Sequence, residues 1–254
     1  MKYLLVFIIT FISSLHADII MGVVPQQSPL KLLKAWSPIA QYLSEKTGEK
    51  VIFKTETSIT KFEKVLYSGG YDFAYMNPYH FVVAHQTQGY TANIRAYKNI
   101  KGILVMKKGL GIEKIKDKDN IFLFPAPNAF AATLLTKYDL IQKFGVDLKT
   151  LNKARYVNSH DSVYKGISRN FGDIGGGIER TYNTLTDKQT KESLNIVHTT
   201  KAYPSHPFAF KATMNKEKKE RIIHALLNID ASYLKRLKIK KLKTIDNSEY
   251  DIIK

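Results

Sequence analysis

The feature that most constrains the fold is a short apolar strand that stops at a proline and passes straight into a helix. The stretch 69–84 reads GGYDFAYMNPYHFVVA, with an apolar run at 73–75 followed by Asn77 and Pro78. Proline cannot donate to a strand ladder and biases the preceding residue to extended backbone, so the strand ends there. Proline is well tolerated in the first turn of a helix, so residues 79–85 are predicted to be helical.

The same alternation of strand and helix recurs along the chain. Predicted strands are 18–24, 51–53, 73–75, 122–124, 156–157, 172–179, 196–197 and 208–210, and predicted helices are 30–45, 61–67, 129–143, 162–168, 186–193 and 216–227. Strand, helix, strand units demand a right-handed crossover and parallel strands, so we expect an α/β protein with mostly parallel sheets flanked by helices.

Two segments change character and are predicted to cross between lobes. They lie near 97–101, where apolar and basic residues alternate, and near 200–204, where prolines break an extended run. These crossings would divide the chain into one lobe made from both ends, 18–97 and 203–254, and one made from the middle, 98–202.

The junction at Asn77 is also the first candidate site. Open α/β sheets bind ligands where a strand ends and a helix begins, because free backbone N–H groups point outward there. Tyr75 and Tyr79, with Asn77 and His80, would stand around this point as one wall of a small-molecule site. The alternative is that both tyrosines are ordinary core aromatics.

A second proline-ended strand leads into the helix that begins near Asn128, Ala129 and Phe130. Two such junctions facing each other would make a cleft. His160 and Asp161 open a third helix, where capping alone would explain both residues. The functional alternative is that His160, partly charged or donating through a ring N–H, bonds a ligand oxygen.

The chain is strongly basic, with 39 Lys and Arg against 22 Asp and Glu and a formal charge of +17. Such a charge favours a negative partner: nucleic acid, an anionic membrane face or a small anion. The lysines are spread along the whole chain, so a solvated basic surface without a specific partner is the alternative. Predicted export argues against nucleic acid.

The first 17 residues have the layout of a secretory signal. Lys2 precedes an apolar run from Leu4 to Ile12 and a small-residue exit that ends at Ala17, so Asp18 is the expected mature start. The alternative is an uncleaved anchor. The chain contains no Cys, which excludes a lipid anchor on Cys, disulfides, thiol nucleophiles and thiolate metal sites.

Catalytic and metal-binding motifs are absent from the sequence. It has neither a G-x-S-x-G elbow nor an H-E-x-x-H pair, and the glycines at 175–177 lack the Lys-Ser/Thr ending of a phosphate loop. His80 and His85 are five apart and do not share a helix face, which disfavours a metal site. We therefore expect no enzyme activity, no cofactor and no metal.

Several segments in order resemble the phosphate/phosphite/phosphonate family of ABC-transporter substrate-binding proteins. They are GVVP at 22–25, LSEKTG at 43–48, YDFAYMNPYHF at 71–81, NSHDSVYKGI at 158–167 and GDIGGGIERTY at 172–182. The resemblance implies a monomeric, two-lobe periplasmic binding protein that closes on a small anionic ligand. It also implies delivery of that ligand to an ABC permease in the inner membrane.

The resemblance also implies roles for particular residues. The ligand-binding positions that match are Thr57, Ser58, Tyr75, Tyr79, His160, Asp161 and Glu179. An acidic Glu179 beside an anion requires a protonated ligand, or else Glu179 orients His160.

One segment departs from the family. Where the family has a Ser-Thr-Ser-Gly run, this chain has Pro127-Asn128-Ala129-Phe130, so backbone N–H groups remain but hydroxyl donors do not. A more apolar or aromatic anion is thereby possible. A sensor subunit that signals to a membrane histidine kinase is the alternative function.

Overall fold

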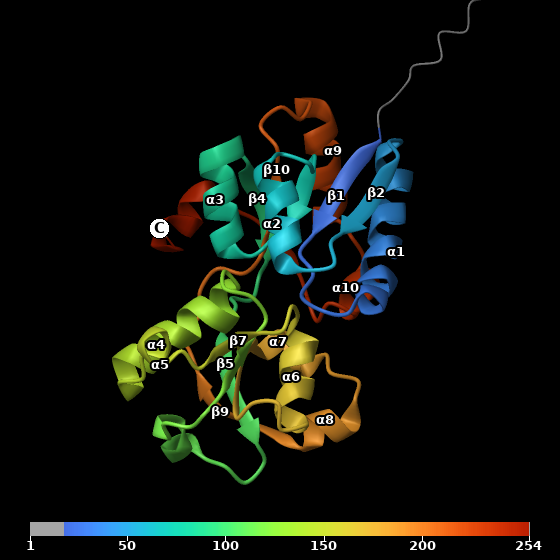
Figure 1. Ribbon diagram of the computed structural model, residues 1–254. Coiled ribbons are helices and arrows are strands. Elements are labelled where there is room, and N and C mark those ends of the chain that lie inside the picture. The colour runs from blue at the N-terminus through green and yellow to red at the C-terminus, as the bar shows by residue number, and fades with distance from the viewer. Residues whose placement is uncertain (1–17, 254) are drawn as a thin grey trace, which may run out of the picture.

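The computed structural model describes residues 18–253, which form two β-sheets flanked by helices (Figure 1). The predicted signal segment 1–17 lies outside the described residues. The first sheet has six strands in the order β11-β4-β10-β3-β1-β2. Its strands are β1 (Ile19–Val23), β2 (Val51–Thr55), β3 (Phe73–Tyr75), β4 (Thr91–Ala96), β10 (Pro207–Phe210) and β11 (Leu242–Thr244). The helices of this lobe are α1 (Pro29–Thr47), α2 (Ile59–Tyr67), α3 (Pro78–Gln88), α9 (Lys216–Leu227), α10 (Ala231–Lys235) and the 3₁₀ segment η3 (Asn247–Ile253).

The second sheet has five strands in the order β7-β6-β8-β5-β9. They are β5 (Gly102–Lys107), β6 (Phe122–Phe124), β7 (Ala154–Tyr156), β8 (Ile174–Ile178) and β9 (Leu194–Thr199). Its helices are η1 (Ile112–Lys116), the π-helical η2 (Phe130–Leu135), α4 (Thr136–Phe144), α5 (Leu148–Leu151), α6 (His160–Ser168), α7 (Glu179–Asn183) and α8 (Lys188–Glu192). The expected two-lobe α/β class is confirmed.

Both sheets are mixed, where mostly parallel sheets were predicted. Strand β1 pairs in parallel with β2 and β3, and β6 pairs in parallel with β7 and β8, whereas β10, β4 and β11 pair antiparallel, as do β8, β5 and β9. The antiparallel pairs have a simple cause. The strand by which the chain leaves a lobe and the strand by which it returns lie side by side in β4–β10 and β5–β9, so they run in opposite directions.

Two segments connect the sheets, from β4 to β5 and from β9 to β10. They lie next to each other, because Ile100 and Tyr203 form an antiparallel bridge with N···O distances of 2.8 and 2.9 Å. The lobe boundaries placed at 97/98 and 202/203 stay a prediction.

The packing around strand β8 explains why its middle residues are glycines. A Cβ at Gly176 would lie 2.2 Å from the Ala132 carbonyl oxygen of η2, and a Cβ at Gly177 would lie 2.2 Å from the Tyr164 hydroxyl of α6. The glycines therefore admit the η2 backbone on one face of the strand and α6 side chains on the other, as expected from a strand that something must approach closely. The large buried cluster that fills the first lobe continues across to Phe130 and its neighbours in η2.

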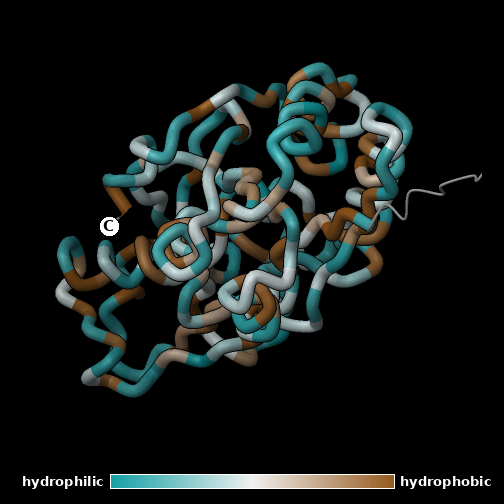
Figure 2. The backbone as a smooth tube through the Cα atoms, turned by 90° about the horizontal axis from the view of Figure 1, so that it is seen from above, coloured by the Kyte–Doolittle hydropathy of each residue, from teal (hydrophilic) through white to brown (hydrophobic). Residues whose placement is uncertain are grey.

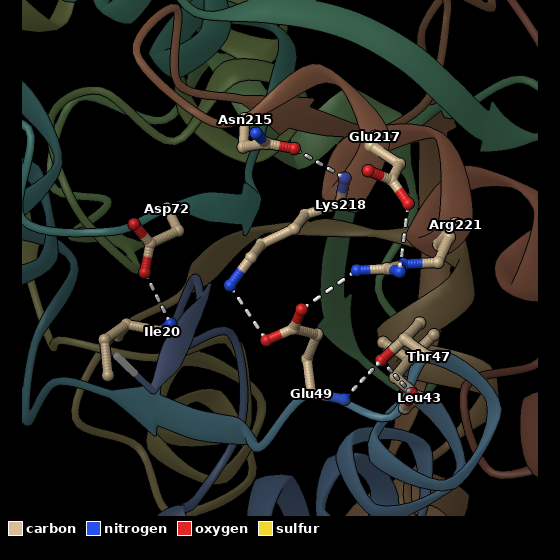
Figure 3. Close-up of polar contacts among 9 residues, drawn as sticks. All are labelled: Ile20, Leu43, Thr47, Glu49, Asp72, Asn215, Glu217, Lys218 and Arg221. Atoms are coloured by element: carbon tan, nitrogen blue, oxygen red, sulfur yellow. Dashed lines mark hydrogen bonds and ion pairs between the residues drawn. The ribbon is translucent and has the colours of Figure 1, made fainter. Parts of the chain in front are cut away.

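The C-terminal return of the chain is fastened to the first lobe by Glu49 (Figure 3). The Glu49 carboxylate lies 2.9 Å from Lys218 Nζ and 2.9 Å from Arg221 Nη2, both on α9.

Figure 2 shows hydrophobic and hydrophilic residues alternating along most of the backbone, as expected of elements with one buried side. Over residues 18–253, the structure contains no helix with the length and apolarity needed to cross a bilayer.

Candidate functional site

The ends of several elements converge on two small cavities between the sheets. The first, called here the Asn77 cavity, has a volume of about 10 Å³. It is lined by Val24, Gln26, Ile59, Asn77, Ile100, Ala129, Phe130, Ala131, Ala132, His160, Ile178 and His206. The second, the Tyr75 cavity, has a volume of about 20 Å³ and shares Val24 and Gln26 with the first. Each cavity is about the size of one water molecule. Residues from both sheets therefore meet around a shared, nearly closed space.

Asn77 stands where β3 ends and α3 begins. Its Oδ1 accepts a hydrogen bond from the His80 N–H at 2.8 Å, so it caps the helix, and Pro78 follows in the first turn. Its Nδ2 donates to the Asn128 carbonyl at 3.1 Å, across to the second lobe. The predicted strand end and helix start at Asn77 are therefore present. The Asn77 side chain also connects this junction to the one at Asn128.

His160 begins α6 in the second lobe and is only 2% exposed. Its backbone N–H donates to the Gln26 carbonyl of the first lobe at 3.0 Å, while its ring Nδ1 has no hydrogen-bond partner among the described residues. Burial, with the nearby Arg180 guanidinium, lowers the pKa of His160 to about 3. The imidazole is therefore neutral near pH 7, which favours donation through a ring N–H over a charged His160.

Asp161 joins the two lobes beside His160. Its Oδ2 lies 3.0 Å from Lys31 Nζ and accepts from the Ser28 N–H at 3.4 Å, both at the start of α1. Capping of α6 is instead the work of Ser159, whose Oγ accepts from the Ser162 N–H at 3.1 Å. Asp161 is therefore an interlobe contact rather than only a helix-dipole residue.

Tyr75 lies at the centre of an aromatic stack in the Tyr75 cavity. Its ring is 4.7 Å from the Trp36 ring and 5.3 Å from the His206 ring, with the His206 plane tilted by 22°. The Arg180 guanidinium lies 5.8 Å from the Tyr75 ring centroid, within the range of a cation–π contact. The Tyr75 hydroxyl is buried and has no hydrogen-bond partner among the described residues. Burial raises the pKa of Tyr75, so this hydroxyl keeps its proton.

Gln26 connects these residues. Its Nε2 lies 2.7 Å from His206 Nε2, and its Oε1 accepts from Arg180 Nη2 at 3.4 Å. Burial lowers the pKa of His206, and the positive charge of Arg180 adds to the effect, so this imidazole is also neutral. The cavities therefore combine one guanidinium with neutral ring and hydroxyl donors and helix starts, a set that suits an anion rather than a cation.

Five residues predicted for the site lie together here. The Tyr75 cavity is lined by Tyr75, and the Asn77 cavity is lined by Asn77, Ala129, Phe130 and His160. Asn128 contributes its carbonyl to Asn77, and Asp161 closes the lobe contact outside the cavities.

The remaining predicted residues lie elsewhere. Thr57 is exposed, Ser58 caps α2 by accepting from the Lys61 N–H at 3.2 Å, and Tyr79 is half-buried against the first core. None of these three lines either cavity. Glu179 is not placed against His160: it lies 3.5 Å from Lys98 at a basic groove on another face.

Sequence reasoning missed Gln26, Arg180 and His206. The signal for Arg180 was present, because it directly follows the acidic residue singled out after the glycine strand; both line the same basic groove, and only Arg180 also lines the Tyr75 cavity. His206 sits in the proline-rich segment that was interpreted only as a crossing.

Two α/β lobes meet around these two cavities. This arrangement is typical of a protein that binds a ligand between its lobes. A family model described as "ABC transporter, phosphonate, periplasmic substrate-binding protein" matches residues 21–250, and the chain belongs to that family. It is a transport substrate-binding protein and not an enzyme.

Solved structures support the fold. A binding protein component of an ABC phosphonate transporter from Pseudomonas aeruginosa superposes with a TM-score of 0.85 at 16% identity, over 94% of this chain and 84% of that chain. A Prochlorococcus marinus protein in complex with methylphosphonate gives 0.84 at 18% identity, over 93% and 95%. A Xanthomonas citri protein bound to chloride ion gives 0.70 at 14% identity, over 91% and 93%.

Proposed function

We propose that this chain captures a compact phosphorus oxyanion between its lobes, of the phosphonate, phosphite or phosphate class, and presents it to an ABC importer. The observation that carries the proposal is the placement of Arg180, Tyr75, His160 and His206 around the two cavities. Arg180 supplies the positive charge, and the neutral imidazoles and the tyrosine hydroxyl supply donors that an oxyanion accepts.

The size of the cavities favours a small ligand. Volumes of about 10 and 20 Å³ each hold about one water molecule, so in this proposal the lobes open to admit the oxyanion, and a compact headgroup needs less opening than an aromatic ligand. Phe130 lines the Asn77 cavity and packs edge-on to Tyr203 at 5.7 Å, so its ring is already engaged. The loss of hydroxyl donors near Asn128 is offset, in this proposal, by Arg180. Thr57, Ser58, Tyr79 and Glu179 remain proposed ligand residues that would have to be reached by movement of the lobes.

Titration calorimetry tests the proposal with methylphosphonate, phosphite and phosphate, and with acetate and methanesulfonate for comparison. We expect at least one phosphorus oxyanion to bind and the other anions to bind more weakly. Arg180→Gln should weaken binding by about tenfold or more, because a charge-assisted hydrogen bond contributes about 1.5–3 kcal/mol. Arg169→Gln makes the same charge change at an exposed position and should bind like the wild type. Equal losses in both variants, or no binding of any phosphorus oxyanion, would refute the proposal.

We further propose export to the periplasm with removal of residues 1–17, and action as a monomer. The amino-terminal sequence of the protein recovered from cells tests the first point and should begin at Asp18. The family match favours a permease over a sensor kinase as partner. Loss of oxyanion uptake in a strain lacking this chain would support the importer role, and normal uptake would contradict it.

A further inference from the structure

A second basic feature adjoins the cavities described above and shares Arg180 with the Tyr75 cavity. It is a groove of about 940 Å³ on the face where the lobes are connected, called here the hinge groove. Its walls come from the 97–101 connecting segment, from α7 of the second lobe and from the α10–β11 region of the first lobe. Figure 1 shows α7 and α10 at the facing ends of the two lobes.

The charge of the hinge groove is strongly one-sided. Its basic residues are Lys98, Lys101, Arg180, Lys235, Lys238, Lys240 and Lys241, and its one acidic residue is Glu179. Glu179 pairs with Lys98 at 3.5 Å. Within residues 18–253, the other five lysines form no ion pair. Like charges this close raise the local potential unless a multivalent anion binds there.

Backbone pairing fixes the two segments that carry most of these lysines. The Tyr97 N–H donates to the Lys241 carbonyl at 2.9 Å, and Leu242 pairs with Ala96 where β11 lies against β4. This pairing puts the 97–101 segment beside the 235–241 segment. Lys238 has a φ of 53°, a left-handed conformation that favours glycine, yet a lysine stands there.

The shape of the groove narrows the choice of partner. A volume of about 940 Å³ lies at the upper end of small-molecule sites, whose range is about 300–1,000 Å³. A concave groove surrounds a compact ligand, whereas a flat anionic membrane would contact only the outermost lysines. We propose that the hinge groove is a second anion site that binds a soluble compound with several linked phosphate groups, distinct from the single small oxyanion bound between the lobes.

The test uses the full mature chain and inorganic tripolyphosphate as the probe. We expect one tripolyphosphate to bind per chain, and we expect its affinity to fall as the ionic strength rises, because exposed charges are screened by salt. The triple variant Lys235→Gln, Lys238→Gln, Lys241→Gln should weaken binding by about tenfold or more. A matched triple, Lys116→Gln, Lys118→Gln, Lys188→Gln, removes the same charge at exposed positions outside the groove and should stay within about twofold of the wild type.

A single variant separates binding from folding. Lys238→Gly removes one groove charge and places the preferred residue at this φ, so it should weaken tripolyphosphate binding without lowering the melting temperature. An equal loss of tripolyphosphate affinity in both triple variants would mean that binding depends only on net charge, and it would overturn the proposal. Failure of tripolyphosphate to bind would also overturn it, as would groove-dependent binding only to vesicles that contain phosphatidylglycerol. None of these variants changes Tyr75, His160, His206 or Arg180, which both sites share, so methylphosphonate binding between the lobes should be unchanged in all of them.

Discussion

Burial fixes the protonation of the histidines around the Asn77 cavity. His160 and His206 are at most 2% exposed, and the guanidinium of Arg180 further disfavours a second positive charge near them. Neutral imidazoles can donate to an oxyanion without the desolvation cost of a buried charge. The same burial makes the folded protein sensitive to acid.

The stability of the protein should therefore fall as the pH drops. The pKa of His160 is about 3 in the folded protein, below its ordinary value of 6.5, and that of His206 is also lowered. The unfolded chain therefore takes up protons first, so stability is full above about pH 6.5 and declines as the pH falls toward about 3. Each group contributes a slope of at most about 1.4 kcal/mol per pH unit. Urea unfolding at pH 7 and pH 5 measures this, and His160→Gln should show a smaller loss than the wild type. An identical loss in the variant would contradict the assignment.

The Tyr75 hydroxyl should contribute to ligand binding. It is buried, protonated and without a partner among the described residues, and its ring lines the cavity that Arg180 also lines. Tyr75→Phe should weaken binding of the cognate oxyanion by about tenfold, since a buried hydrogen bond to a charged group contributes about 1.5–3 kcal/mol. Tyr71→Phe is the control, because the Tyr71 hydroxyl is also buried without a partner but lines neither cavity. Calorimetric titration compares the two, and equal affinities would remove Tyr75 from the ligand contacts.

Helix and strand junctions carry most of what could be predicted from the sequence. The Asn77-Pro78 pair specifies a strand end and a helix cap through local rules, and both appear where expected. The glycines of β8 implied a close approach, which the carbonyls of η2 and the α6 side chains provide. Residues 130–135 form a π-helix where a regular helix was predicted, and Thr133 Oγ1 bonds the Ala126 carbonyl at 2.7 Å there. Sequence periodicity does not encode this local departure.

The site residues that sequence reasoning missed depend on long-range pairing. Gln26 follows β1, Arg180 lies in the short helix α7 after β8, and His206 directly precedes β10, so no local pattern connects the three residues. They meet because the lobes close on each other through contacts such as Asp161 with Lys31. Such contacts between residues more than a hundred positions apart leave no signal in local spacing.

Glu49 should anchor helix α9 to the loop that follows α1 in the first lobe. Its side chain is 4% exposed and meets two cations, Lys218 and Arg221, whereas Glu217 meets the same arginine at 3.3 Å with 78% of its side chain exposed. Glu49→Gln should lower the free energy of unfolding by about 1–3 kcal/mol, and Glu217→Gln should lower it by less than about 0.5 kcal/mol. Urea denaturation with matched slopes measures the difference. Similar values for both variants would contradict an anchoring role.

The positive charge of the whole molecule is mostly dispersed, with one group of lysines gathered at the hinge groove. The formal charge of +17 had two interpretations from sequence, a specific partner or a solvated surface. Much of the charge is dispersed, but Arg180 lies at the cavities and a group of lysines lines the hinge groove. Residues of both lobes line both locations, so an anion that binds at either with different affinities for the open and closed forms would shift the placement of the lobes.

The most direct measurement of the central claim is a crystal structure of the mature chain grown with methylphosphonate. We expect phosphonate density between the lobes, with its oxygens within hydrogen-bond distance of Arg180 and of at least one of Tyr75, His160 and His206. Density for the phosphonate only on an outer surface, with Arg180 still bonded to Gln26 and the two cavities unchanged, would contradict it.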